Sequence, residues 1–274
     1  MKKPLLLLAA LTTGTFSFCY GNVEERQEQS TAQVFSQPLQ TALFDSEEKG
    51  KNLPIRQAPV WFGKSEIEDR LIISLPLYLG MGFELLSSAY SLDLVYLALI
   101  APAAWVVSDL IIAVVHMMTD SLQSTKGPQF IRDFAGGIDD HHKNPYRLAQ
   151  DSFWSVSKRN HVAAYLPFII SEIFRQNDCP ALAYMTGIIT FSTAFAQFIH
   201  ACAHGRHKDS RFIQFLQTMG IILSPEGHRG HHRGNHDTNF CLISGHTEPL
   251  ASFIYSGSCW MTAKVKPFYD RFRS

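Results

Sequence analysis

The sequence has few cysteines and no excess of charge of either sign. Only five of its 274 residues are cysteines, and no two of them form a C-x-x-C pair. Such an odd, scattered set argues against a disulfide framework and against a zinc site built from thiolates. Lysine and arginine together number 24, as do aspartate and glutamate together. Because nucleic-acid binding requires a basic surface, we expect no nucleic-acid partner.

The chain also lacks the short motifs that hold a redox cofactor. It contains no G-x-G-x-x-G between a strand and a helix, and no C-x-x-C-H for haem attachment. If the protein carries out redox chemistry, its electrons therefore have to come from a separate protein.

The N-terminal residues 1–21 have the layout of a secretory signal peptide. Two lysines precede an apolar run from Leu5 to Leu11, and small or polar residues follow. Cys19-Tyr20-Gly21 is a poor small-x-small cleavage site, so an uncleaved N-terminal anchor is the alternative. Residues 22–66 are polar and rich in Gln, Glu and Ser, which predicts a flexible arm.

Long apolar runs begin only at Leu71. Leu71–Ala89 and Val95–Met118 each reach the ~20 residues that cross a hydrocarbon core. A shorter run, Val162–Phe174, is followed by a long one, Ala181–Ile199. Phe212–Leu223 is apolar at helical spacing but too short to cross, which predicts an interfacial or buried helix.

These runs predict an all-α fold, a polytopic membrane helical bundle of about four spans. We expect the membrane domain over residues 67–255, followed by a C-terminal tail over 256–274.

Histidine is the residue type that stands out. The chain has 12 histidines. Neutral imidazole is the commonest protein metal ligand, and eight grouped histidines are too many for one tetrahedral zinc ion. They suit two metal ions. The four groups are His116; His141 and His142; His200 and His204; and His228, His231 and His232.

The grouped histidines map to one side of the predicted bundle. His116 and His200 lie at the C-terminal ends of the second and fourth predicted spans. An even number of crossings separates those ends, so both emerge on the same face. The polar regions 119–160 and 200–274 carry the other six. The sequence therefore predicts a His-rich di-metal cap on one face.

Helical spacing suggests how the ligands are shared. His200 and His204 are four residues apart, so they can bind one metal together. His228, His231 and His232 have the spacing to do likewise. The adjacent His141 and His142 cannot share a helical face, which favours two neighbouring metals or one metal approached from irregular backbone.

Two further observations concern residues outside these groups. Asp109 lies two helical turns before His116 inside an apolar span, where an ionisable group is costly and usually functional, and we expect it to orient His116 as a hydrogen-bond acceptor. His161, His207 and His246 are each isolated, so we expect ordinary hydrogen-bonded roles for them.

An imidazole-rich site without thiolates suits iron, copper or zinc. Two metals at the edge of a membrane, beside a deep apolar body, indicate oxidative chemistry on an acyl or alkyl chain. An unactivated C–H bond is too strong for acid–base catalysis, so metal-activated oxygen is required.

Five segments together resemble the lipid desaturase domain family, whose members act on ether lipids or on chloroplast phosphatidylglycerol. The resemblance covers about residues 95–255, and the string H-x-x-H-H-(three residues)-H-[DE]-T-x-F-C is its most specific part. The segments are Asp109–His116, Phe130–Phe134, His141–Pro145, Gln197–His204 and His228–Cys241.

The resemblance implies an oxygen-dependent lipid desaturase with two iron ions, O2 as co-substrate, a membrane lipid as substrate and an external electron donor of the cytochrome b5 or ferredoxin kind. Plasmanyl-to-plasmenyl conversion of an ether lipid is one candidate reaction. Three residues are implied as catalytic: His236, as a ninth ligand or an acid–base group, and Asp109 and Asp120, as acidic positions of the first motif. The implied iron ligands are His116, His141, His142, His200, His204, His228, His231 and His232.

Two alternatives remain open from sequence. A di-iron lipid hydroxylase would need the same histidines. A membrane metal-binding or transport protein would place ionisable groups deep inside several spans, whereas here only Glu84 and Asp109 lie inside them.

The topology signals of the chain conflict. An exported N-terminus would place the metal face outside the cell. The positive-inside rule places it in the cytoplasm, where electron donors are usually found, and we expect this second arrangement for an integral membrane protein. The basic residues of region 119–160 are Lys126, Arg132, Lys143, Arg147, Lys158 and Arg159.

Overall fold

The computed structural model describes residues 65–122, 128–233 and 236–270, and these residues form helices joined by turns, with no strand among them. The all-α prediction is therefore confirmed. The predicted signal peptide or anchor (1–21) lies outside the described residues, as does the predicted arm (22–66) except for its last two residues.

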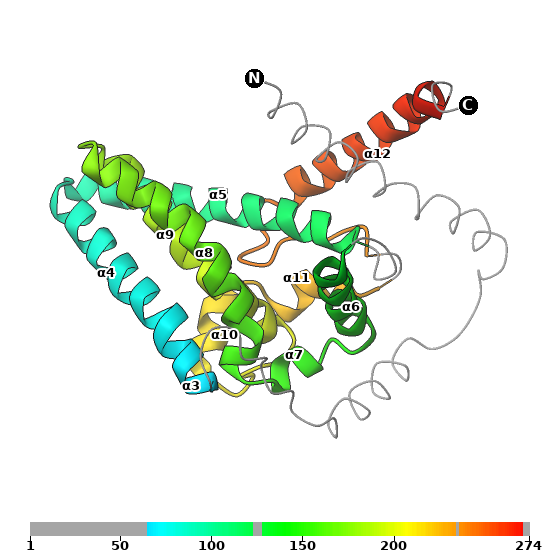
Figure 1. Cartoon of the computed structure of the whole chain (residues 1–274), viewed down its shortest axis with the longest axis horizontal. Helices are drawn as coiled ribbons and strands as arrows, with labels where there is room; N and C mark the ends of the chain where they lie inside the picture. The colour runs from blue at the N-terminus through cyan, green and yellow to red at the C-terminus, as the bar shows by residue number, and fades with distance from the viewer. Residues whose placement is uncertain (1–64, 123–127, 234–235, 271–274) are drawn as a thin grey trace.

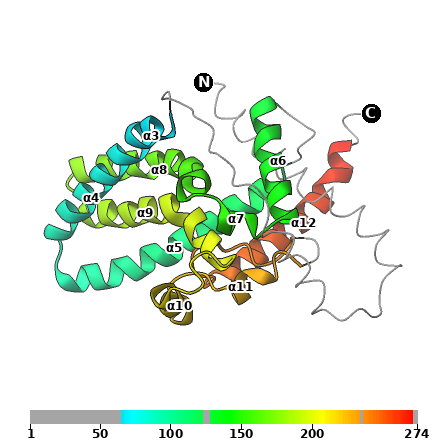
Figure 2. The same cartoon turned by 90° about the horizontal axis from the view of Figure 1, so that it is seen from below.

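Two long helical segments form a V (Figure 2). The first runs through α3 (Glu66–Asp69), the π-helical turn η1 (Arg70–Ser74) and α4 (Leu75–Tyr90). Its start is capped by Ser65, whose hydroxyl accepts a hydrogen bond from the backbone N–H of Glu68. A short turn then reverses the chain into α5 (Leu94–Asp120), so α4 and α5 meet at one end and diverge toward the other.

An antiparallel hairpin of α8 (Phe153–Gln176) and α9 (Pro180–Ala203) completes the bundle, and it is the most extensive helix pair among the described residues. Asp178 takes a left-handed φ of +54° in the connecting turn, and Pro180 begins α9 where its missing N–H costs nothing. α9 contacts both α4 and α5 and lies between the arms of the V.

The remaining helices gather where α5 and α9 end (Figure 1). The first half of α12 packs on α5, where Ala251 and Tyr255 contact Ala113 and Met117, and its second half projects away from the bundle. Residues 256–270, predicted as a tail, are thus mostly helical. The bounds are α6 (Gln129–Lys143), α7 (Arg147–Gln150), α10 (Arg211–Thr218), α11 (Pro225–Arg229) and α12 (Glu248–Asp270).

Three helices among the described residues are long and apolar enough to cross a membrane: Glu66–Tyr90, Leu94–Asp120 and Pro180–Ala203. The sequence predicted about four spans. The difference is α8, which contains the predicted run Val162–Phe174 but carries charged residues near both ends. Because α8 packs along α9, its apolar middle still lies beside the other spans.

One charge near the start of α8 is neutralised inside the protein. The Lys158 ammonium is buried and forms an ion pair with Asp69, which is fully buried at the start of the first helical segment. Because a buried charge is tolerated only with a partner, this pair explains how a lysine can lie within the bundle.

Candidate metal centre

Five histidine side chains converge where α6, α9 and α11 meet. Their candidate ligand atoms all lie within 4.8 Å of one another. α9 supplies two of them from its last turn and C-cap, four residues apart, as the sequence predicted. This five-histidine group comprises His141, His200, His204, His228 and His232.

A second group lies beside the first and contains a carboxylate. Asp120 and His116 lie four residues apart at the end of α5 and therefore share a face. The Asp120 carboxylate lies 3.4 Å from the Nε2 atoms of His116 and His231, and 3.6 Å from that of His142. This three-histidine–aspartate group comprises His116, Asp120, His142 and His231.

Adjacent residues link the two groups. His141 belongs to the five-histidine group and His142 to the other, and their ring centroids are 5.7 Å apart. His231 and His232 are divided in the same way, at 5.3 Å. Two donor groups that are linked by residues adjacent in the chain suit a pair of neighbouring metal ions.

The expectation that His228, His231 and His232 bind one metal together is wrong, because the chain does not remain α-helical through all three. α11 ends at Arg229, and the backbone N–H of His231 donates to the His228 carbonyl three residues back. This tighter turn directs His231 toward His116 and leaves His228 and His232 in the five-histidine group.

The spacing of the donor atoms fits bound metal. The Nε2 atom of His200 lies 2.8 Å from that of His228 and 3.0 Å from that of His204. Donor atoms held about 2.1 Å from one ion lie roughly 3 Å apart. Both carboxylate oxygens of Asp120 and Nε2 of His141 are buried without a hydrogen-bond partner among the described residues. Such orphaned acceptors need a cation to offset their desolvation.

Backbone carbonyls orient several of these rings. The Nδ1 atom of His116 lies 2.9 Å from the Phe240 carbonyl oxygen, and that of His231 lies 2.9 Å from the Thr238 carbonyl oxygen. A proton on Nδ1 leaves the Nε2 lone pair free for a metal. Sequence reasoning missed these partners, since a carbonyl oxygen carries no residue-type signal.

Burial keeps the histidines in the form that binds metal. Desolvation, with smaller contributions from neighbouring imidazoles, lowers the pKa of His142 to about 3. The same causes lower the pKa values of His204, His228 and His231 well below the usual value. These rings are therefore neutral at pH 7 and present lone pairs rather than charge.

Asp109 does not orient His116, which corrects the sequence expectation. Its carboxylate instead accepts hydrogen bonds from the backbone N–H groups of Ile243, Ser244 and Thr247, at 3.0–3.2 Å, and from two hydroxyls. These donors belong to an irregular segment that lies against α5. Backbone without regular structure is tolerated at membrane depth only where its polar groups are paired inside the protein.

His236 lies outside both donor groups. Its ring stacks on His142, with centroids 3.9 Å apart and planes 7° from parallel, and its Nδ1 lies 2.7 Å from the His231 carbonyl oxygen. It takes a left-handed φ of +54°. The structure thus places His236 over one candidate ligand.

The three isolated histidines also lie outside the donor groups. His161 is fully buried, with its two ring nitrogens each 2.8 Å from a hydroxyl, those of Ser74 and Tyr78. His207 and His246 are exposed. A further residue that sequence reasoning missed is Arg206, a buried guanidinium that donates to the carbonyls of Leu148 and Asp151 and ties α7 to the end of α9.

The role of Asp120 can be tested by changing it to asparagine. If its carboxylate is a metal ligand, Asp120→Asn should weaken metal binding in its own group by at least about tenfold, so that purified protein retains close to one metal per chain. Elemental analysis after dialysis against a chelator measures this. Asp140→Asn is the matched control, because Asp140 lies on α6 beside the site but pairs with Arg147. Wild-type metal content in Asp120→Asn would contradict a ligand role.

Comparison with known proteins agrees with this arrangement. The family profile of the lipid desaturase domain matches residues 105–254. Fatty acid desaturase 4-like 1, chloroplastic, from Arabidopsis thaliana is 28% identical over 149 residues, which are 54% of this chain and 50% of the relative. Fatty acid desaturase 4, chloroplastic, from the same plant is 28% identical over 152 residues, which are 54% of this chain and 45% of the relative. Plasmanylethanolamine desaturase 1 of Mus musculus is 26% identical over 159 residues, which are 56% of this chain and 58% of the relative.

The chain therefore spans about half the length of the curated relatives it matches. No solved structure matches it.

Proposed function

Because the chain belongs to the lipid desaturase domain family, we propose that it is a membrane oxidoreductase that introduces a double bond into an alkyl or acyl chain of a lipid, using two iron ions and O2. The observation that carries this proposal is the pair of adjacent donor groups at the end of a bundle of membrane-length helices. An acid–base enzyme would have no use for such a donor set.

The donor set favours iron. The five-histidine group offers one donor more than the four that a structural zinc ion takes. The second group combines imidazole with a carboxylate, which suits a harder ion than copper(I). Bound there, a pair of iron ions would activate O2, the oxidant that removal of hydrogen from an unactivated C–H bond needs.

The chain's own residues would hold and orient this centre. Neutral imidazoles supply lone pairs, and the carbonyls of Phe240 and Thr238 fix the rings of His116 and His231. With its Nδ1 anchored on a carbonyl, His236 has its Nε2 left to carry a proton to or from the reaction. Asp109 supports the centre indirectly, because it accepts a hydrogen bond from the Ile243 backbone N–H in the segment that follows Phe240.

The substrate we propose is a membrane lipid. The names of the relatives indicate two candidates, a fatty acyl chain and the plasmanyl chain of an ether lipid. Conversion of –CH2–CH2– to –CH=CH– with O2 consumes two electrons and two protons and releases two water molecules. A cytochrome b5-like or ferredoxin-like protein would supply the electrons, since the chain carries no redox motif of its own.

The experiment is product analysis on purified, iron-loaded protein in nanodiscs that contain acyl and plasmanyl lipids, with a chemical reductant and O2. A desaturase yields a lipid lighter by two hydrogen atoms. A lipid heavier by one oxygen atom would instead identify a hydroxylase, and unchanged lipid with metal flux into vesicles would identify a transporter.

We also propose that the metal face lies in the cytoplasm, where electron donors are available. Basic residues on the metal side, Arg132 and Lys143 on α6 and Arg147 on α7, support this orientation. α12 begins on that same side, packed against the end of α5. A reporter fused after Ser274 should therefore read out as cytoplasmic, and a periplasmic or lumenal signal would overturn this orientation.

A further inference from the structure

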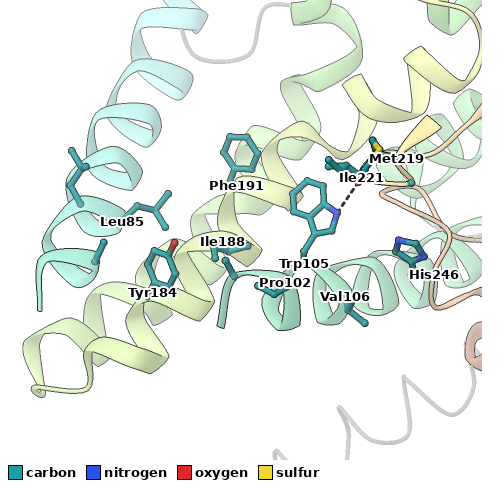
Figure 3. Close-up of a pocket in the computed structure, with 14 residues that line it drawn as sticks. Leu85, Pro102, Trp105, Val106, Tyr184, Ile188, Phe191, Met219, Ile221 and His246 are labelled. Atoms are coloured by element: carbon teal, nitrogen blue, oxygen red, sulfur yellow. Dashed lines mark hydrogen bonds between the residues drawn. The ribbon is translucent and has the colours of Figure 1, made fainter. Parts of the chain in front are cut away.

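An apolar cavity of about 740 Å3 lies between α4, α5 and α9, away from the metal centre, and it is open to the outside, since Leu86 and Met219 in its lining are 75% and 60% exposed. α4 and α5 form two of its walls, α9 forms the floor, and the turn after α10 closes one end (Figure 3). Its volume falls in the range of about 300–1,000 Å3 that is typical of ligand sites. The lining includes Leu85, Ala101, Trp105, Ile188, Phe191 and Ile221.

A hydrogen bond holds the end of the cavity that faces the metals. The indole Nε1 of Trp105 donates to the Ile221 carbonyl at 2.8 Å (Figure 3). Gly220 makes this contact possible, because its φ of +67° lets the chain turn sharply after α10. A Cβ there would also lie 3.3 Å from the His246 ring. The Trp105 indole proton is thus satisfied by the protein, and the ring face remains for apolar contact.

The distance from the metal centre to the cavity matches the reach of one lipid chain. Trp105 lies three helical turns before His116, or about 16 Å along α5 at 1.5 Å per residue. Half of the hydrocarbon core of a bilayer is roughly 15 Å thick. Because α4, α5 and α9 are all candidate membrane spans, the cavity lies where lipid chains lie. A chain that begins near the metals would reach it.

The end of the cavity beside the turn after α10 adjoins an exposed apolar surface. Phe212 and Phe215 on α10 and Met219 after it are 67%, 55% and 60% exposed, while Ile213 on the same helix is buried. Met219 also lines the cavity. A short helix with exposed aromatic residues on one face is typical of the membrane interface, so lipid would surround this end of the cavity.

We propose that this cavity binds one hydrocarbon chain of a membrane lipid, with Trp105 at its metal-side end and Leu85 at its deeper end. The identification of that lipid as the substrate rests on the proposed function. The binding itself does not, because it follows from the apolar lining, the volume and the position of the cavity among the candidate membrane spans.

Tryptophan fluorescence tests the binding. The wild-type protein and Trp105→Phe are placed in phosphatidylcholine nanodiscs that contain increasing amounts of phosphatidylethanolamine brominated near the methyl end of one chain. The difference between the two signals isolates Trp105 from the other three tryptophans, Trp61, Trp154 and Trp260. We expect quenching of Trp105 to saturate at low mole fraction. Quenching that only follows the bulk mole fraction of brominated lipid would overturn the proposal.

A substitution on α5 that fills the cavity has a matched control on the same helix. Ala101→Phe occupies the cavity, whereas Ala103 is exposed and does not line it. We expect Ala101→Phe, and independently Ile188→Phe, to weaken saturable quenching at least about fivefold, and Ala103→Phe to leave it unchanged. Unchanged quenching in both filling variants, with metal content retained as proof of folding, would also overturn the proposal.

Product analysis on the same samples separates this inference from the proposed function. We expect the filling variants to lose more of their turnover of long chains than of short chains, while the wild type turns over both. Saturable quenching in a protein that desaturates nothing would support the chain site and refute the desaturase. Unaltered turnover of long chains in variants that bind none would show that the substrate chain lies elsewhere.

Discussion

Replacing His204 with alanine is expected to remove the metal from the five-histidine group and to reduce desaturation by more than about 100-fold. Removing a residue that merely supports a ligand already costs 10–100-fold in metal affinity or activity, and removing a donor costs more. His204 is the best of the five to change, because it is the C-cap of α9 and only partly buried. The measurements are metal per chain by elemental analysis and product by lipid mass spectrometry.

His207→Asn is the matched control for this substitution. His207 lies three residues further along, is exposed and belongs to neither donor group. Asparagine tolerates the left-handed φ of +54° at that position, whereas alanine would add backbone strain. We expect the control to keep two metals and full activity. A His204→Ala protein that also keeps both would refute the assignment of this group.

The same measurements distinguish a ligand from a proton carrier at His236. If His236 moves a proton, His236→Asn keeps both metals and loses rate. If it is a ninth ligand, the metal content falls as well. Because His236 stacks on His142 rather than joining a donor group, we expect the first outcome.

The convergence of the histidines could be predicted from sequence because it depends on local spacing and on span ends. His200 and His204 share a face by helical geometry, and His116 and His200 end helices that run toward the same side. Both features follow from periodicity and from hydropathy, which are local properties of the chain.

The division of the histidines between two groups could not be predicted in the same way. It depends on where α11 ends, and a helix end shifts with its tertiary surroundings. Asp120 illustrates the same limit, since the family resemblance implied a catalytic residue, while its carboxylate lies among the ligand atoms of three histidines from three different segments.

Hydropathy alone also did not predict the full length of α8. The predicted run began at Val162, but the helix begins at Phe153, where the Ser152 hydroxyl caps it. Its early turns contain Lys158, which is neutralised by Asp69 from a segment far away in the sequence. A hydropathy window cannot register a partner 89 residues distant. Long-range pairing of this kind is what the sequence leaves undetermined.

Asp109 is the clearest case of such pairing, and replacing it is expected to have the largest effect on stability. Asp109→Ala would leave three buried backbone N–H groups, those of Ile243, Ser244 and Thr247, without their acceptor. Each unpaired buried donor costs about 1–3 kcal/mol, so we expect a loss of at least about 3 kcal/mol. For a domain of this size that lowers the melting temperature by roughly 6–12 °C, measurable by differential scanning fluorimetry in detergent.

Asp109→Asn should resemble the alanine variant more than the wild type, because the amide keeps one acceptor oxygen and turns a donor toward other donors. Asp93→Asn is the control, since Asp93 is exposed before α5 and its side chain caps nothing, and we expect a change within about 0.5 kcal/mol. An Asp109→Asn protein as stable as the wild type would show that the carboxylate does not hold this segment.

The Asp109 variants should also lose metal unevenly, because the segment they release begins next to Phe240, whose carbonyl orients His116. We expect the three-histidine–aspartate group to lose its metal on dialysis while the five-histidine group, built from α6, α9 and α11, retains one. A general loss of folding would empty both groups together. Retention of one metal per chain at a temperature below the lowered melting point would therefore identify Asp109 as a positioning residue for one half of the centre.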